Sequence, residues 1–327
     1  MTKRSVMKYL MFVLKAAITL GLIWVVLRNI DMADTMARVR SVSLAVSLGG
    51  LGLLLLLSLL SIVRWRIVMK QFGRVLGFGL TTRLFFEGLF FNQALPSTVG
   101  GDGVRVYRAF RAGLTLPAAI NSVVLDRVLG LTSLMILAAI AQPLFYERVD
   151  SLGARLSFTA VFVAALCGIV FLLSFAFLPE RFRRWKVIAG LASLSHAARQ
   201  AFATPAIFFP VTILSVTGHM ISVVVFYLLA VSLDLGVSFV DCLVMVPSVL
   251  LLATVPISVA GWGLREGAMV AAFGLLGVPA GGAAAASVLF GIGMALIALP
   301  GGLLWFANPD RGVKDVDALA PGQSNRA

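Results

Sequence analysis

Six stretches of the chain are apolar for long enough to cross a lipid bilayer, which takes about 20 residues in a helix. They lie at Tyr9–Leu27, Leu44–Val63, Ala118–Phe145, Ser157–Leu178, Ala206–Leu233 and Ala283–Phe306. Two further apolar regions, Leu84–Gly113 and Phe239–Pro279, are each interrupted by proline, glycine and charge. The pattern predicts an all-α polytopic membrane protein with six crossing helices and two broken segments.

The composition excludes a water-soluble globular protein. Of the 327 residues, 60% are hydrophobic and 13% are charged, whereas soluble domains contain about 45–50% apolar and about 25% charged residues. We expect one integral membrane domain at residues 1–307 and a disordered cytoplasmic tail at residues 308–327, where the chain becomes polar. In a membrane protein, a net charge of +13 usually comes from basic residues in the cytoplasmic loops. The charge therefore does not indicate a nucleic-acid partner, and none is expected.

The distribution of basic residues predicts how the chain crosses the membrane, because cytoplasmic loops carry an excess of Lys and Arg. Two basic segments follow the second and fourth spans, with Arg64, Arg66, Lys70, Arg74 and Arg83 in one and Arg181, Arg183, Arg184, Lys186 and Arg199 in the other. The segments Glu147–Arg155 and Asp234–Asp241 carry no such excess and are expected outside. Each broken region then enters and leaves on one face, so we expect two oppositely oriented re-entrant hairpins and cytoplasmic termini.

The two broken regions contain a repeated motif. Pro96–Arg105 and Pro256–Arg265 align at an offset of 160 residues without a gap, and five of their ten positions are identical. The identical pairs are Pro96/Pro256, Val99/Val259, Gly101/Gly261, Gly103/Gly263 and Arg105/Arg265. Similar segments on opposite faces form the inverted repeat of secondary transporters, whose broken helices hold the substrate near the membrane midplane.

The residue types in this motif suit the binding of an anionic headgroup. Proline ends a helix and glycine lets the backbone approach a ligand closely, and the next half-helix presents free N–H groups toward an anion. An arginine there can bind phosphate in a bidentate manner, so we expect Arg105 and Arg265 to bind one headgroup phosphate. The candidate substrate-binding residues are Asn92, Pro96, Gly100, Gly101, Asp102, Arg105, Asp126, Arg127, Pro256, Gly261, Gly263, Arg265 and Glu266.

Charged residues at membrane depth require partners, because each unpaired charge there costs roughly 2.5–3.5 kcal/mol. Asp126 and Arg127 are neighbours in sequence and so do not face each other on a helix, and Arg105 or Arg265 are the expected partners of Asp126. The acids Glu87, Asp102, Asp126 and Glu266 nearly balance the bases Arg105, Arg127 and Arg265. A purely structural ion-pair network therefore stays open as the alternative to a substrate site.

Two other patterns are interpreted as structural. Trp65 and Trp185 stand beside basic residues and are expected to anchor helices at the membrane interface. Ser287, Gly291 and Ala295 follow one another at four-residue spacing and are expected to form a helix-packing face without a role in the site.

Three ordered blocks of sequence resemble a known family. Asn92–Arg105, Val124–Arg127 and Pro256–Gly267 are similar to the signature blocks of the lysylphosphatidylglycerol synthase transmembrane-domain family, the flippase-like proteins. The resemblance extends from Leu10 to Phe306. It implies a lipid-handling protein of the bacterial inner membrane whose re-entrant loops form a central cavity. The soluble aminoacyl-transferring domain of the synthases has no counterpart here, so no lysyltransferase activity is expected.

We therefore expect a lipid translocase that binds an amphipathic lipid by its phosphate or polar headgroup. An ion-coupled transporter of a small polar solute is the alternative, and a non-transport accessory subunit of lipid or glycan synthesis is another. A homo-oligomer and a complex with a lipid-biosynthesis enzyme both stay open. With two cysteines and two histidines, no metal site, cofactor or catalytic residue is expected, and the protein is interpreted as a non-enzyme.

The charge distribution yields a prediction about topology. Single cysteines at Arg105 and Arg111 should be accessible from the cytoplasm, whereas cysteines at Val237 and Pro279 should both be accessible from outside. Accessibility labelling of whole cells measures this. If Val237 and Pro279 react from opposite sides, the second broken region crosses the membrane and the hairpin interpretation is wrong.

Overall fold

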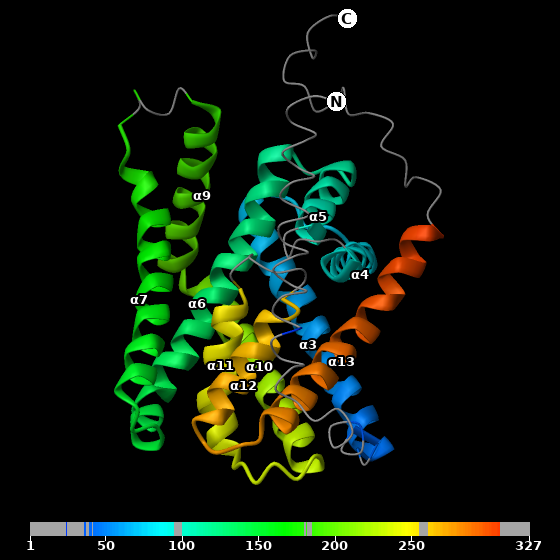
Figure 1. Ribbon diagram of the computed structural model, residues 1–327. Coiled ribbons are helices and arrows are strands. Elements are labelled where there is room, and N and C mark those ends of the chain that lie inside the picture. Colours follow the sequence, from blue (N-terminus) through cyan, green and yellow to red (C-terminus); the bar gives the residue numbers. More distant parts are fainter. Residues whose placement is uncertain are drawn as a thin grey trace, which may run out of the picture.

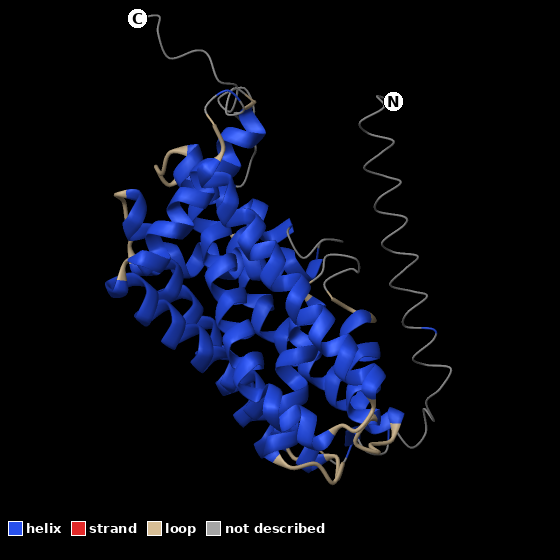
Figure 2. Ribbon diagram, turned by 90° about the vertical axis from the view of Figure 1, so that its left-hand side faces the viewer, coloured by secondary structure: helices blue, strands red, loops and turns tan. Residues whose placement is uncertain are grey.

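The computed structural model describes residues 24, 36, 39–40, 42–94, 100–179, 181, 185–254 and 261–307. Within these residues the chain is helical and contains no strand (Figure 2). The α-helices are α3 (Leu44–Met69), α4 (Phe78–Ala94), α5 (Gly100–Arg111), α6 (Leu116–Arg148), α7 (Leu152–Ser174), α9 (Lys186–Ala203), α10 (Pro205–Ser232), α11 (Phe239–Ala253), α12 (Leu264–Gly274) and α13 (Ala280–Phe306). The predicted all-α class is confirmed.

Five of these segments are long and apolar enough to cross a membrane. They are Leu44–Phe72, Leu116–Arg148, Leu152–Phe177, Pro205–Ser232 and Ala280–Phe306. Each contains or overlaps one of the predicted spans, so the protein is a multi-pass membrane protein. The predicted first span, Tyr9–Leu27, and the predicted tail at 308–327 lie outside the described residues.

Local sequence signals explain where several of the long helices begin. The hydroxyl of Ser43 accepts a hydrogen bond from the backbone N–H of Val46 at the start of α3, and Thr115 and Ser151 cap α6 and α7 in the same way. Such caps satisfy one of the backbone N–H groups that the first turn leaves without an intrahelical partner. These helices therefore begin at a polar residue that directly precedes an apolar run.

Each broken region forms two short helices that pack against each other. In the first region α4 and α5 are in contact, and in the second α11 and α12 are in contact. None of the four reaches the length of about 20 residues that a spanning helix needs. In Figure 1 the α4–α5 pair lies toward the end of the bundle where α6 begins and α7 ends, and the α11–α12 pair lies toward the opposite end.

Helix α9 was missed by the sequence interpretation, which treated this segment as a basic loop. Its apolar side packs against α6, α7 and α10, and Ala198 and Ala201 are fully buried there. The hydroxyl of Ser195 donates to the carbonyl of Leu173 at 2.8 Å and accepts from the N–H of Ala176 at 2.9 Å. Small residues therefore bring α9 close to the end of α7, although the flanking arginines mask this face in the sequence.

Helix α13 lies directly against the backbone of α4. A Cβ atom added at Gly301 would stand 1.8 Å from the carbonyl oxygen of Phe86, and one at Gly302 would meet the ring of Phe90. A side chain at Gly301 would push the two helices apart, so glycine is required at this crossing. The close contact ties α4 to a helix that is long enough to span the bilayer.

Candidate functional site

The carboxylate of Asp126 on α6 lies between two guanidinium groups from other helices. Arg64 on α3 donates from Nε to Oδ1 at 2.8 Å, and Arg105 on α5 donates from Nη2 to Oδ2 at 3.2 Å. Arg64 also donates to the hydroxyl of Ser215 on α10 at 3.2 Å. Because Asp126 is only 1% exposed, these contacts neutralise a carboxylate that would otherwise be buried without a partner.

A second carboxylate extends this arrangement to the surface of α6. Asp102, in the first turn of α5, accepts two hydrogen bonds from Arg127, from Nε at 2.9 Å and from Nη2 at 3.1 Å. Asp102 also forms an ion pair with Arg105 at 3.6 Å. We call the five residues Arg64, Asp102, Arg105, Asp126 and Arg127 the first cluster. Of the two partners predicted for Asp126, Arg105 and Arg265, it is Arg105 that binds it.

Two aromatic rings hold the guanidinium of Arg105. The Cζ atom of Arg105 lies 4.1 Å from the centre of the Trp65 ring and 5.2 Å from that of Phe85. Trp65 is fully buried and its Nε1 donates to Ser122. The prediction that Trp65 is an interfacial anchor is therefore wrong, because α3 turns this residue into the protein, where it contacts Arg105 through a cation–π interaction.

The N-terminus of α5 is held close to α4 by a hydrogen bond and two glycines. Asn92 accepts from the backbone N–H of Gly101 at 2.9 Å. A Cβ atom at Gly101 would stand 1.8 Å from the carbonyl oxygen of Gly88. Gly100 is the first residue of α5. Asn92, Gly100 and Gly101 thus position the start of α5, from which Asp102 and Arg105 project into the first cluster.

A buried ion pair on the same two helices lies beside the first cluster. Glu87 on α4 is fully buried and accepts from Nε of Arg108 at 2.8 Å and from Nε of Arg83 at 3.0 Å. Arg83 also donates to the carbonyl of Leu304 on α13. These contacts join α4, α5 and α13 by charge as well as by packing.

The second motif forms a separate cluster on α12 and α13. Arg265 donates from Nε to Glu266 at 3.1 Å and to the hydroxyl of Ser287 at 3.2 Å. Glu266 in turn accepts from the N–H of Gly263 at 2.6 Å. A Cβ atom at Gly291 would stand 2.1 Å from Nη2 of Arg265. Ser287 and Gly291 thus lie on the face of α13 that packs against α12, as predicted, and this face accommodates the side chain of Arg265.

The two motifs differ in how their arginines are placed. Arg105 lies in the second turn of α5, whereas Arg265 is the second residue of α12 and follows a turn in which Gly261 and Gly263 both have φ of +81°. Arg265 pairs with its own neighbour rather than with Asp126. Pro96 and Pro256, the other predicted site residues, lie outside the described residues.

Two arginines that the sequence interpretation placed in a cytoplasmic segment, Arg64 and Arg83, belong to these clusters, together with Arg108 on α5. Six guanidinium groups, of Arg64, Arg83, Arg105, Arg108, Arg127 and Arg265, pair with four carboxylates, of Glu87, Asp102, Asp126 and Glu266. The predicted near-balance of charge is therefore wrong, and positive charge is in excess. Arg64 was detectable in principle, since it lies within the same helical run as the apolar span before it.

The described residues contain no group of three or more His, Cys, Asp or Glu that could hold a metal ion.

No curated protein matches the chain. The sequence profile of the family described as lysylphosphatidylglycerol synthase TM region matches residues 12–301. The chain belongs to this family, as its three motifs indicated.

The close contact between α4 and α5 generates a prediction. Gly101→Ala should lower the melting temperature of the purified protein, because the new methyl group must displace the backbone of Gly88, an overpacking that costs about 1–3 kcal/mol. Gly103→Ala is the matched control, since it adds the same methyl group to the same helix with nothing within 4 Å. Equal melting temperatures for the two variants would show that α4 and α5 are not in this close contact.

Proposed function

We propose that this member of the lysylphosphatidylglycerol synthase TM-region family is a lipid translocase of the bacterial inner membrane. In this proposal the first cluster binds the anionic headgroup of an amphipathic lipid, while the acyl chains stay in the bilayer. No catalytic step is assigned to it. The family membership and the membrane-spanning helices support the location, and the charges of the first cluster support the ligand.

The observation that carries the proposal is the exposed side chain of Arg127. This side chain is 51% exposed, although it lies about 16 Å along α6 from Leu116, within a helix that is apolar enough to cross the membrane. A charge at such a position faces a water-filled cavity or an ionic partner, because hydrocarbon does not solvate it. Asp102 is one such partner, and the exposed part of the side chain leaves room for an anion to approach from the bilayer or from water.

The charge of the first cluster favours a phosphate as that anion. Three arginines share two carboxylates, so the cluster carries one positive charge in excess. A phosphate group would neutralise the excess, and a guanidinium binds it with two parallel hydrogen bonds. Since Arg127 already binds Asp102 in this bidentate manner, a headgroup phosphate would take the place of that carboxylate with little change in the orientation of Arg127.

The buried members of the cluster would position the group that binds. Asp126 holds Arg64 and Arg105 by one oxygen each, and the rings of Trp65 and Phe85 fix the plane of Arg105. These contacts keep the positive charges close together before any ligand arrives. Asp126 would therefore act as a positioning residue.

We further propose that the α4–α5 and α11–α12 pairs are re-entrant hairpins of opposite orientation, with both chain termini in the cytoplasm. Their helices are too short to span, the members of each pair are in contact, and the pairs lie toward opposite ends of the bundle in Figure 1. The repeated glycine motif falls at the start of the second helix of each pair, which is the place where an inverted repeat would bring substrate-binding groups together.

The proposal predicts that Arg127→Gln reduces translocation at least tenfold with little change in melting temperature. Loss of the bidentate phosphate contact removes binding, whereas an ion pair on so exposed a side chain contributes only about 0–1 kcal/mol to stability. Arg127→Lys should restore part of the rate, because an ammonium keeps the charge without the planar fork. The rate is measured in phosphatidylcholine vesicles that contain a fluorescent phosphatidylglycerol. A quencher added outside the vesicles destroys the fluorescence of the outer leaflet, so the further loss of fluorescence reports how fast lipid moves outward.

Arg148→Gln is the matched control. Arg148 lies at the other end of α6, is 41% exposed and pairs with Asp241 outside the first cluster. Its loss should leave translocation unchanged. If Arg127→Gln translocates lipid at the normal rate, or loses activity only in proportion to a fall in melting temperature, the first cluster is a structural ion-pair network. Uptake of a polar solute without lipid movement would instead favour a solute transporter.

A further inference from the structure

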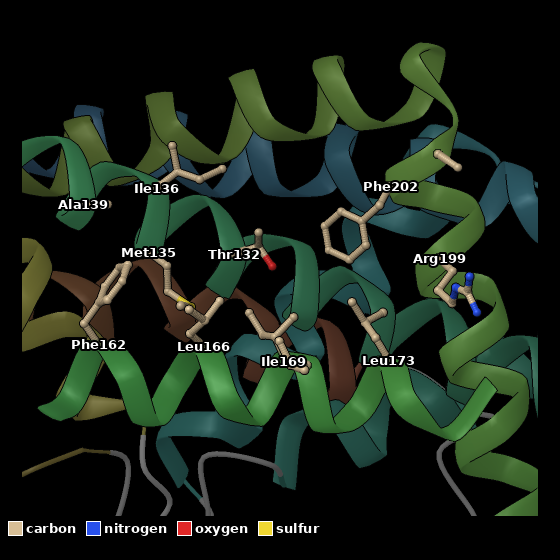
Figure 3. A pocket seen from close by; sticks show the side chains of 12 residues that line it. Thr132, Met135, Ile136, Ala139, Phe162, Leu166, Ile169, Leu173, Arg199 and Phe202 are labelled. Atoms are coloured by element: carbon tan, nitrogen blue, oxygen red, sulfur yellow. The ribbon is translucent and has the colours of Figure 1, made fainter. Parts of the chain in front are cut away.

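A groove of about 620 Å³ opens on the outer side of the bundle between α6, α7 and α9 (Figure 3). Its walls are apolar side chains from all three helices, among them Met135 and Ile136 on α6, Leu166 and Ile169 on α7, and Phe202 on α9. The hydroxyl of Thr132, which also lines the groove, donates to the carbonyl of Val128 within its own helix. The walls therefore suit a hydrocarbon chain.

One end of the groove carries a positive charge. Arg199 on α9 lies beside Leu173 at this end, whereas Ala139 and Phe162 lie at the other (Figure 3). The guanidinium stacks on the ring of Phe177 with Cζ 4.1 Å from its centre. The side chain is exposed, and no carboxylate of the described residues lies within ion-pair distance of it. An apolar groove that ends at an arginine complements an anionic lipid, which has an apolar chain and a negatively charged headgroup.

The length of the groove matches one leaflet of a bilayer. From Phe162 to Leu173 it follows α7 for about 16 Å, close to half of the hydrocarbon thickness of about 30 Å. Arg199 contacts Phe177, which follows the end of α7, and α7 ends on the side of the bundle where the α4–α5 pair also lies (Figure 1). A lipid with its phosphate at Arg199 would place its acyl chain along the groove and its chain end near the midplane.

The surroundings of α7 also favour a lipid. No side chain along α7 is buried, although the helix is among the most apolar in the protein. Such a helix lies among acyl chains, so lipid reaches the groove without leaving the bilayer. The occupant therefore requires no partner beyond the membrane itself.

We propose that this groove is a binding site for an anionic phospholipid of the leaflet on the Arg199 side, with one acyl chain between α6, α7 and α9 and the phosphate at Arg199. The site is distinct from the first cluster, and it stands whether or not the protein translocates lipid. The lipid would fill the space between α7 and the rest of the bundle, and the membrane's content of anionic lipid would determine how often this space is filled.

The site is tested with two photoreactive lipids that carry a diazirine on one acyl chain and differ in headgroup. Full-length protein is reconstituted in phosphatidylcholine vesicles with a small fraction of either the phosphatidylglycerol or the phosphatidylcholine probe. After illumination, the labelled positions are mapped by mass spectrometry of peptides. We expect the phosphatidylglycerol probe to label the groove residues of α6, α7 and α9 more strongly than the outward positions of α7. At the groove residues, its labelling yield should also exceed that of the phosphatidylcholine probe.

Two variants and their matched controls assign the two ends of the lipid. Arg199→Gln should lower groove labelling by phosphatidylglycerol about fivefold, the effect of one basic residue on an anionic lipid. Lys70→Gln, which removes one exposed charge after α3, should not. Ala139→Phe fills the far end of the groove and should displace the chain, whereas Ala164→Phe adds the same ring to an exposed position on α7 outside the groove and should not. Melting temperatures check that each variant is folded.

Three results would overturn the proposal. Labelling spread evenly over all exposed faces of α7 would mean ordinary solvation by lipid. Equal groove labelling by both probes, unaffected by Arg199→Gln, would remove the headgroup contact. Native mass spectra showing a dimer that Ala139→Phe dissociates would assign the groove to a second copy of the chain.

Discussion

The sharing of Asp126 between Arg64 and Arg105 is the interaction on which the arrangement of this protein depends. It joins α3, α5 and α6 at one carboxylate, and Arg64 extends the contact to α10 through Ser215. Apolar helices in a bilayer gain little from hydrophobic association, because lipid tails are as apolar as their side chains. Charges that find partners only on other helices therefore decide which helices become neighbours.

Close packing at glycine, together with the ion pairs, positions α5 against its neighbouring helices. The hydrogen bond from Gly101 to Asn92 and the missing side chain at Gly101 let α5 start directly against α4. This brings Asp102 and Arg105 to the side chains of α6. Gly101 of the first motif thus affects the site indirectly, because it allows the backbones of α4 and α5 to come close. The charged side chains of α5 then lie within reach of those on α6.

The sequence predicted the long helices and the breaks well, because length and apolarity alone determine a membrane span. It also indicated that Asp126 and Arg105 would meet. It did not place Arg64 and Trp65 in the protein interior. Both lie in α3, which continues past its apolar run, but basic residues at the end of such a run are equally typical of a loop. It did not indicate that Ser287 would accept a hydrogen bond from Arg265, because a row of small residues looks the same whether it faces a helix backbone or an arginine side chain. Such side-chain directions depend on tertiary contacts that local patterns do not encode.

The turn between α5 and α6 has a mechanical consequence. Helix α5 lies against the backbone of α4 at Gly101, and α4 lies against α13 at Gly301, so a displacement of α5 would also press on α4 and α13. Gly113, at the turn, has φ of +98°, and its carbonyl accepts from Nη1 of Arg74 at 2.8 Å. Arg74 lies in the segment between α3 and α4, so this hydrogen bond ties the α5–α6 turn to that segment. The end of α5 and the start of α6 are therefore fastened by a residue that belongs to neither helix, in addition to the ion pairs of the first cluster that join the two helices.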